Sequence, residues 1–166
     1  MKKEFTHLDK NSNPQMVDVS GKNQTTRTAR SQGYICLPRE VMDLLNADGD
    51  ISTKKGPVFQ TARIAATMAV KKTADLIPLC HPLMTEGVAV EITTDDSLRA
   101  WVECSVTITG KTGVEMESLT GVSVGLLTIY DMCKAFGKDM EIGGIHLIEK
   151  KGGKSDYNAK AKQELK

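Results

Sequence analysis

Apolar and polar residues alternate along several short stretches of this chain, which is the pattern of a strand with one face buried. Val17 and Val19 are separated by Asp18 and followed by Ser20, and the same period runs through 87–92 and 100–108. The acidic turn at 95–97 lies between the last two stretches, so they are predicted to form an antiparallel hairpin. In all, the sequence predicts five strands, at 16–20, 27–37, 87–92, 100–108 and 140–148.

Helices are predicted between these strands. A short one is expected after Pro38, and Gly56-Pro57 marks the start of a longer one that runs to Lys72. The longer helix is rich in alanine, which indicates close packing on another element. Residues 113–136 are apolar on more than one side, as in a central, buried helix. Antiparallel strands with helices packed on one face predict an α+β sandwich.

The chain of 166 residues is long enough for one domain with a real core. We expect this domain at 16–155, between a polar N-terminal arm at 1–15 and a polar C-terminal tail at 156–166. The formal net charge is +1 and aromatic residues make up 4%. Neither value favours a nucleic acid or an anionic membrane as partner, so any anion must be bound by a local cluster.

The N-terminal residues lead into polar sequence and not into an apolar signal core. No run approaches the ~18 apolar residues of a membrane helix. Four cysteines without a C-x-x-C motif are expected to be reduced thiols, so the chain is predicted to be cytoplasmic.

Cys80 and His81 stand side by side with prolines close on both sides, which fix the backbone around them. Adjacent residues rarely coordinate one ion, and the other histidines lie in the arm and a late strand, so no metal site is predicted. A buried cysteine is more often a small core residue than a nucleophile. His81 suits a hydrogen bond to a ligand or proton transfer near neutral pH. A histidine that is satisfied by its own loop is the open alternative.

The stretch Thr109–Gly113 contains Gly-Lys-Thr between a predicted strand and a predicted helix. A P-loop needs a glycine five positions before this glycine, where the chain has Ser105. The same test fails at 153–155, because the corresponding residue is Ile148. A P-loop ATPase is therefore excluded. Two readings stay open for this stretch: an anion site at a helix start, or a plain tight turn.

Asp131 and Lys134 lie three residues apart, and therefore on one face of the long helix. At a surface they would form a routine, weak ion pair. Their apolar neighbours instead suggest desolvation, which would shift both pKa values and let the pair act as acid and base. Further cations gather at the ends of predicted elements and suit a polyphosphate: Arg27, Arg30, Lys54, Lys55, Lys111, Lys150, Lys151 and Lys154.

Several longer motifs occur in a consistent order between about residues 16 and 155. They are Met-Val-Asp-Val-Ser at 16–20, Thr-Ala-Arg-Ile-Ala at 61–65, Leu-Ile-Pro-Leu-Cys-His-Pro-Leu-Met at 76–84, Thr-Gly-Lys-Thr-Gly-Val-Glu-Met-Glu at 109–117 with Leu-Thr at 119–120, and Thr-Ile-Tyr-Asp-Met-Cys-Lys-Ala at 128–135. Together they resemble the cyclic pyranopterin monophosphate synthase accessory proteins of molybdenum cofactor biosynthesis (the molybdenum cofactor biosynthesis protein C family).

The resemblance implies a ferredoxin-like α+β fold and a homohexamer built as a trimer of dimers. It implies a lyase that converts a small molecule, the cyclised GTP 3′,8-cyclo-7,8-dihydroguanosine 5′-triphosphate, to cyclic pyranopterin monophosphate with release of diphosphate. No cofactor is implied. The catalytic residues that it implies are Asp131, Lys134 and Lys55. The expected substrate-binding residues are Leu79, Cys80, His81, Glu115, Met116, Glu117, Arg27, Arg30, Lys150 and Lys154.

Glu115 and Asp131 are 16 positions apart on one predicted helix. At 1.5 Å per residue this separates them by about 24 Å, more than one nucleotide comfortably spans. If both line one pocket, they must come from different subunits, so we expect an active site at a subunit interface.

Two rival functions remain. A non-catalytic nucleotide-binding or regulatory module would explain the fold and the cations but leave Asp131 and Lys134 without a role. A thiol-based redox protein would use Cys80, although no resolving cysteine lies near it in sequence.

Overall fold

The computed structural model describes residues 8–159, so His7 and the rest of 1–7, with 160–166 of the predicted tail, lie outside the described residues. The helices are α1 (Arg39–Met42), α2 (Val58–Lys71), α3 (Thr73–Leu76) and α4 (Glu115–Cys133). The strands are β1 (Thr25–Cys36), β2 (Ser52–Thr53), β3 (Gly56–Pro57), β4 (Gly87–Thr94), β5 (Arg99–Gly110), β6 (Ile142–Lys151) and β7 (Tyr157–Asn158).

Five strands form one antiparallel sheet in the order β4-β5-β1-β6-β7. The long strand β1 lies at its centre and pairs with β5 on one side and with β6 on the other. The chain order β1-α2-β4-β5-α4-β6 around this centre is that of a ferredoxin-like α+β fold. The predicted fold class and the predicted hairpin of β4 and β5 are confirmed.

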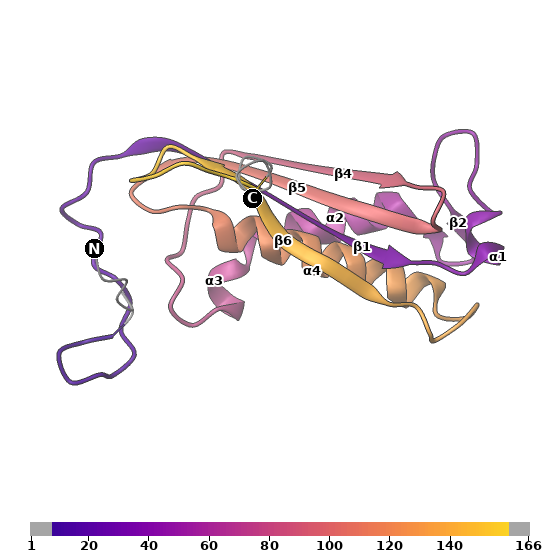
Figure 1. Ribbon diagram of the computed structural model, residues 1–166, viewed down its shortest axis with the longest axis horizontal. Helices are drawn as coiled ribbons and strands as arrows, with labels where there is room; N and C mark the ends of the chain where they lie inside the picture. The colour runs from indigo at the N-terminus through magenta and orange to yellow at the C-terminus, as the bar shows by residue number, and fades with distance from the viewer. Residues whose placement is uncertain (1–7, 160–166) are drawn as a thin grey trace, which may run out of the picture.

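Both long helices cover the same face of the sheet (Figure 1). Helix α4 contacts β1, β5 and β6, while α2 contacts α4 and the edge strand β4. Among residues 8–159, neither long helix lies on the opposite face. Among residues 8–159 no helix is long and apolar enough to cross a membrane.

The core lies between the sheet and the two helices. Along β1 the residues that face the helices, such as Ala29 and Ile35, are fully buried, and those between them are half-buried. Two glycines of α4 bring this helix close to its neighbours: a Cβ on Gly121 would lie 2.7 Å from the Cys104 sulfur, and one on Gly125 would lie 3.5 Å from the Cβ of Ala66. The close packing predicted from the alanines of the second helix is thus confirmed.

Helix α2 begins one residue later than predicted, and Pro57 is its N-cap. Proline has no side-chain acceptor, so the first amide groups of the helix need another partner. Asp50 supplies it from the preceding loop. Its two carboxylate oxygens accept hydrogen bonds from the backbone amides of Phe59 at 2.7 Å and Gln60 at 2.9 Å.

The predicted strand at 16–20 is wrong: these residues form no strand. The alternation itself is real, because Val17 and Val19 are half-buried and their neighbours are exposed. No strand of the sheet pairs with the segment, however, and side chains from elsewhere hold it. The short strand β7, which pairs with β6, was not predicted.

Candidate active site

A pocket of about 490 Å³ opens at the N-terminal end of α4. Its walls come from the first turn of α4, the loop after α3, residues 17–22 and the end of β6. Most of the predicted substrate-binding residues meet here although they are far apart in sequence. Those that line it are Leu79, Cys80, His81, Glu115, Met116, Glu117, Lys150 and Lys154.

The loop after α3 carries Cys80 and His81 into the pocket. A turn shapes it, in which the amide of Cys80 donates to the carbonyl oxygen of Ile77 at 3.1 Å. The Nε2 atom of His81 lies 2.8 Å from the carbonyl oxygen of Val17. His81 therefore lines the pocket and also binds the N-terminal segment, so its partner comes from outside its own loop.

The two glutamates at the start of α4 have different surroundings. Glu115 accepts a hydrogen bond from the Lys150 ammonium group at 2.8 Å. Glu117 is 4% exposed and has no cationic partner among the described residues. Burial, and then the charge of Glu115, raise the pKa of Glu117. The pocket thus holds one carboxylate that is paired with an ammonium group and one whose pKa is raised by burial.

Burial, followed by the charge of Glu117, raises the pKa of Cys80. A reactive cysteine needs the opposite shift, because the thiolate is the nucleophile. The environment of Cys80 therefore disfavours the thiol-redox alternative and fits a cysteine that forms part of the pocket wall.

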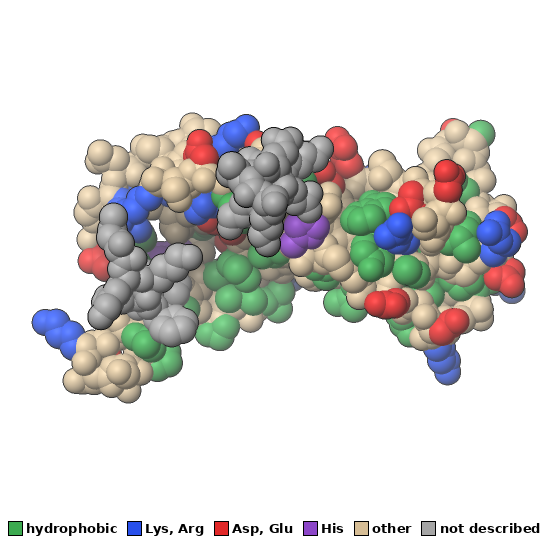
Figure 2. Space-filling view, in the orientation of Figure 1, with side chains coloured by type: hydrophobic (Ala, Val, Ile, Leu, Met, Phe, Trp, Pro, Cys, Tyr) green, Lys and Arg blue, Asp and Glu red, His purple; other side chains and the backbone are tan. Residues whose placement is uncertain are grey.

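Cations surround the open side of the pocket. A smaller cavity of about 190 Å³ shares Lys22, Lys150 and Lys154 with it and adds Arg27 and Lys151. Figure 2 shows Lys and Arg side chains gathered around a hollow at this end of the molecule. Within residues 8–159, Lys22 and Lys154 form no ion pair. Free ammonium groups beside a cavity suit a ligand with several negative charges.

Arg30 lies on the face of the sheet opposite α2 and α4, away from this pocket. Successive side chains of a strand point to opposite faces, so Arg27 and Arg30, three residues apart on β1, cannot face the same way. Arg30 binds Glu103 at 2.7 Å and Glu149 at 3.6 Å. The chain therefore does not bring Arg30 together with the other predicted substrate-binding residues.

The three predicted catalytic residues form a second group at the C-terminal end of α4. Both lysine ammonium groups bind the Asp131 carboxylate, Lys134 at 2.5 Å and Lys55 at 3.2 Å. Lys55 also donates to the Asp131 carbonyl oxygen at 3.1 Å. The structure thus brings Lys55 to Asp131 across 76 positions of sequence.

The expectation that desolvation governs Asp131 and Lys134 is wrong for the single chain. Their side chains are 57% and 52% exposed. Hydrogen bonds from Lys134 and then Lys55 lower the pKa of Asp131, and the bond from Asp131 raises the pKa of Lys134. Both shifts come from the ion pair because this end of the helix is open to solvent. In the single chain the two groups are therefore a stable carboxylate and a stable ammonium.

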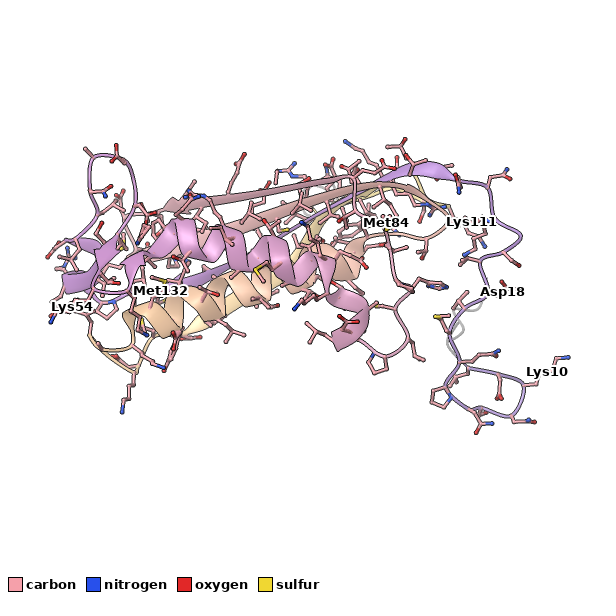
Figure 3. All side chains as sticks on the ribbon, turned by 180° about the vertical axis from the view of Figure 1, so that it is seen from behind. Lys10, Asp18, Lys54, Met84, Lys111 and Met132 are labelled. Atoms are coloured by element: carbon pink, nitrogen blue, oxygen red, sulfur yellow. The ribbon has the colours of Figure 1, made fainter. Side chains whose placement is uncertain are left out.

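The pocket and the Asp131 group lie at opposite ends of the molecule. In Figure 3, Asp18 and Lys111 mark the end with the pocket, and Lys54 and Met132 mark the other end. Glu115 and Asp131 stand on one continuous helix, so its rise separates them by about 24 Å. One pocket within one chain cannot include both.

Several pocket residues were not among the predicted substrate-binding residues. Val17 and Val19 lie in the segment predicted as a strand, Lys22 lies just after it, and Leu83 was named only as part of a longer motif. At the Gly-Lys-Thr turn, Thr112 and Gly113 line the pocket, while the Lys111 ammonium group donates to the Ser20 carbonyl oxygen at 2.7 Å. In the described part of the chain, no three or more His, Cys, Asp or Glu side chains are grouped so that they could hold a metal ion.

Two known proteins are similar to this chain over most of its length. The molybdenum cofactor biosynthesis bifunctional protein of Synechocystis sp. is 51% identical over 158 residues, which cover 93% of this chain and 45% of that protein. The molybdenum cofactor biosynthesis protein 1 of Dictyostelium discoideum is 49% identical over 168 residues, which cover 92% of this chain and 27% of that protein. The chain therefore spans less than half the length of either relative.

The family comparison covers nearly the same part of the chain. The MoaC family matches residues 16–153, from the segment beside His81 to the end of the last long strand. The match includes both groups of residues at the two ends of α4. The chain belongs to the MoaC family.

Proposed function

We propose that this chain is a cyclic pyranopterin monophosphate synthase of molybdenum cofactor biosynthesis. Its substrate would be (8S)-3′,8-cyclo-7,8-dihydroguanosine 5′-triphosphate, and its products cyclic pyranopterin monophosphate and diphosphate. The family and the names of both relatives support the pathway. The reaction is the one that the resemblance implies, and the residues at the two ends of α4 support it.

The main support for this proposal is the pocket with Lys and Arg side chains around its open side. A triphosphate that closes to a cyclic monophosphate leaves diphosphate, so cations are needed both to hold the chain of phosphates and to stabilise the leaving group. Arg27, Lys22 and Lys154 are placed for this beside the pocket. His81 and Glu117 lie deeper in the wall, where they suit the purine-derived ring.

The acid and base would be supplied by the second group. Two ammonium groups around one carboxylate leave a net positive charge, and excluding water from such a group favours loss of a proton from one lysine. Lys55 or Lys134 could then exchange protons with the substrate while Asp131 holds both in place. This requires that the exposed end of α4 be covered.

We propose that another subunit covers it and brings its own pocket. The separation of about 24 Å within one chain then becomes a contact between two chains, and each site contains Asp131 from one subunit and His81 from the other. A homohexamer made of three such dimers would contain the site in every dimer.

The experiment is conversion of the cyclised triphosphate by the wild type and by Asp131→Asn. We expect turnover by the wild type and a loss of about 100-fold or more in the variant, as for removal of an acid–base group. Asp139→Asn is the matched control, because Asp139 is exposed in the turn that follows α4. If Asp131→Asn turned over normally, the catalytic role would pass to Lys134 or Lys55.

A second function is favoured by one observation: a single chain has the cationic pocket without the Asp131 group beside it. Such a chain could bind a nucleotide without converting it, as a nucleotide-binding or regulatory module. Tight binding of GTP with no turnover of the cyclised triphosphate would support this alternative.

A further inference from the structure

Residues 16–22, which we call the N-terminal strap, form one wall of the pocket without belonging to a helix or a strand. Two local hydrogen bonds shape the strap. The amide of Ser20 donates to the Asp18 carboxylate at 2.8 Å, and the amide of Lys22 donates to the Val19 carbonyl oxygen at 3.1 Å. These bonds fix its shape but do not attach it to the rest of the molecule.

Two side chains from distant elements attach the strap. The Lys111 ammonium group, in the turn before α4, donates to the Ser20 carbonyl oxygen at 2.7 Å. The Nε2 atom of His81 lies 2.8 Å from the Val17 carbonyl oxygen. Lys111 and Asp18 are labelled at the same end of the molecule in Figure 3. The strap is therefore attached to the rest of the molecule at two points, Val17 and Ser20.

The bond to Val17 determines which form of the His81 ring is present. A backbone carbonyl oxygen only accepts hydrogen bonds, so Nε2 must carry a hydrogen. In the neutral ring Nδ1 is then the unprotonated nitrogen. No hydrogen bond to Nδ1 exists among the described residues, and the side chain lines the pocket. Nδ1 is thus left as an acceptor for a ligand.

We propose that the Val17 carbonyl is a positioning group. It holds His81 in the Nε2–H form, so that Nδ1 accepts a hydrogen bond from an N–H or O–H group of the bound purine-derived ring. The identity of this ligand rests on the proposed function, whereas the form of the ring does not. The strap then contributes to the site, because a carbonyl group of its backbone orients the substrate-binding residue His81.

The form of the ring is tested in the free protein by long-range proton–nitrogen NMR at mildly alkaline pH. The chain has three histidines, and the His81 signals are those that His81→Gln removes. We expect hydrogen on Nε2 and a lone pair on Nδ1. Hydrogen on Nδ1 would overturn the proposal. This measurement does not depend on any activity, so it stands even if the wild type fails to convert the cyclised triphosphate.

Two variants separate positioning from a purely structural role. Glutamine places an N–H donor near the position of Nε2 but offers no acceptor at the position of Nδ1. His81→Gln should keep the strap as protected from hydrogen exchange as in the wild type, and should lose about 10- to 100-fold in kcat/KM for the cyclised triphosphate. His81→Ala should lose both the strap protection and the turnover.

Two outcomes of this comparison would contradict the proposal. Wild-type turnover by His81→Gln would show that the acceptor at Nδ1 is not needed. A strap as loose in His81→Gln as in His81→Ala would show that the donor at Nε2 does not hold it.

Discussion

Glu117 is a carboxylate in a place that favours its neutral form. It is 4% exposed, has no cationic partner in the described part of the chain, and faces the charge of Glu115. Burial of an ionised carboxylate without a partner costs stability. A protein retains such a residue when the binding site needs it, so Glu117 is a residue whose removal should stabilise the free protein and impair the site.

We predict that Glu117→Gln raises the free energy of unfolding at about pH 8. Because the folded-state pKa of Glu117 is raised, the wild type has its full stability below the unfolded pKa of about 4.3 and loses part of it as pH rises through the folded pKa. Each pK unit of the shift corresponds to ~1.4 kcal/mol. Glutamine does not titrate, so the difference between variant and wild type should grow with pH.

Urea unfolding from acid to mildly alkaline pH measures this difference. Glu91→Gln, at an exposed position of β4, is the control and should show no such trend. A Glu117→Gln variant that is less stable than the wild type at alkaline pH would contradict the account of Glu117.

Much of the site could be predicted residue by residue, because its members belong to recognisable motifs with special chemistry. Cys80, His81 and Glu115 were predicted in this way and do line the pocket. The position of Arg30 was also within reach of the sequence, since three residues along a strand reverse the face. The Val17 carbonyl and Lys22 were not, because their roles depend on tertiary contacts that leave no residue-type signal.

At the scale of elements, a loop residue fixes the start of α2. Asp50 accepts hydrogen bonds from Phe59 and Gln60, nine and ten residues further along the chain. It also accepts from the amide of Ile51 at 2.7 Å. Lys55 lies between Asp50 and Phe59 in sequence, so these hydrogen bonds also hold the two ends of the loop that carries Lys55.

We predict that Asp50→Ala lowers the free energy of unfolding by about 1–2 kcal/mol, as for the loss of a helix cap. Asp48→Ala is the matched control: Asp48 lies in the same loop and is exposed. Urea unfolding of both variants gives the comparison. If Asp50→Ala and Asp48→Ala were equally stable, the hydrogen bonds that Asp50 accepts would contribute nothing to the stability of the protein.

The close packing of α4 against its neighbours depends more on Gly121 than on Gly125. A Cβ on Gly121 would lie 2.7 Å from the Cys104 sulfur and 2.9 Å from Val70, whereas on Gly125 the nearest atom would be Val102 at 3.2 Å. Alanine favours a helix over glycine by up to ~1 kcal/mol. At Gly121 this gain must compete with two close contacts in a packed core.

We therefore predict that Gly121→Ala is destabilising by about 1–3 kcal/mol, while Gly125→Ala changes stability little or raises it. Thermal unfolding of the two variants side by side tests the contrast. If Gly125→Ala were the less stable of the two, the packing at Gly121 would not be tighter than at Gly125, and the prediction would be wrong.

The elements themselves were largely predictable from periodicity. β1, β4, β5, α2 and α4 were each found within a few residues, because each buries one face against the core. The segment at 16–20 alternates equally well, yet a strand also needs a partner for its backbone, and periodicity does not reveal one. β2, β3 and β7 have two residues each, too few to show a period.

At the scale of the molecule, one helix separates the two groups that the reaction would need. α4 is continuous and packs one side against the core along its whole length, so it does not bring Asp131 to Glu115. The proposed shared site would account for the exposure of the Asp131 group, because a second subunit would supply the surface that covers this end of the helix.

Complementation between two inactive variants tests whether each site combines the two ends of α4 from different chains. His81→Ala damages the pocket end and Asp131→Asn the other end, and each variant alone should be inactive. In dimers formed at random from equal amounts of both, about one quarter of the sites would be intact. Mixing His81→Ala with Glu117→Ala, both at the pocket end, is the control and should recover nothing.

The measurement is turnover of the cyclised triphosphate after the two variants have been unfolded and refolded together, with native mass spectrometry to verify mixed oligomers. If the sites are shared between chains, we expect recovery of about one quarter of the wild-type rate. Mixed oligomers that form but remain inactive would contradict it, because every chain would then carry its own damaged site.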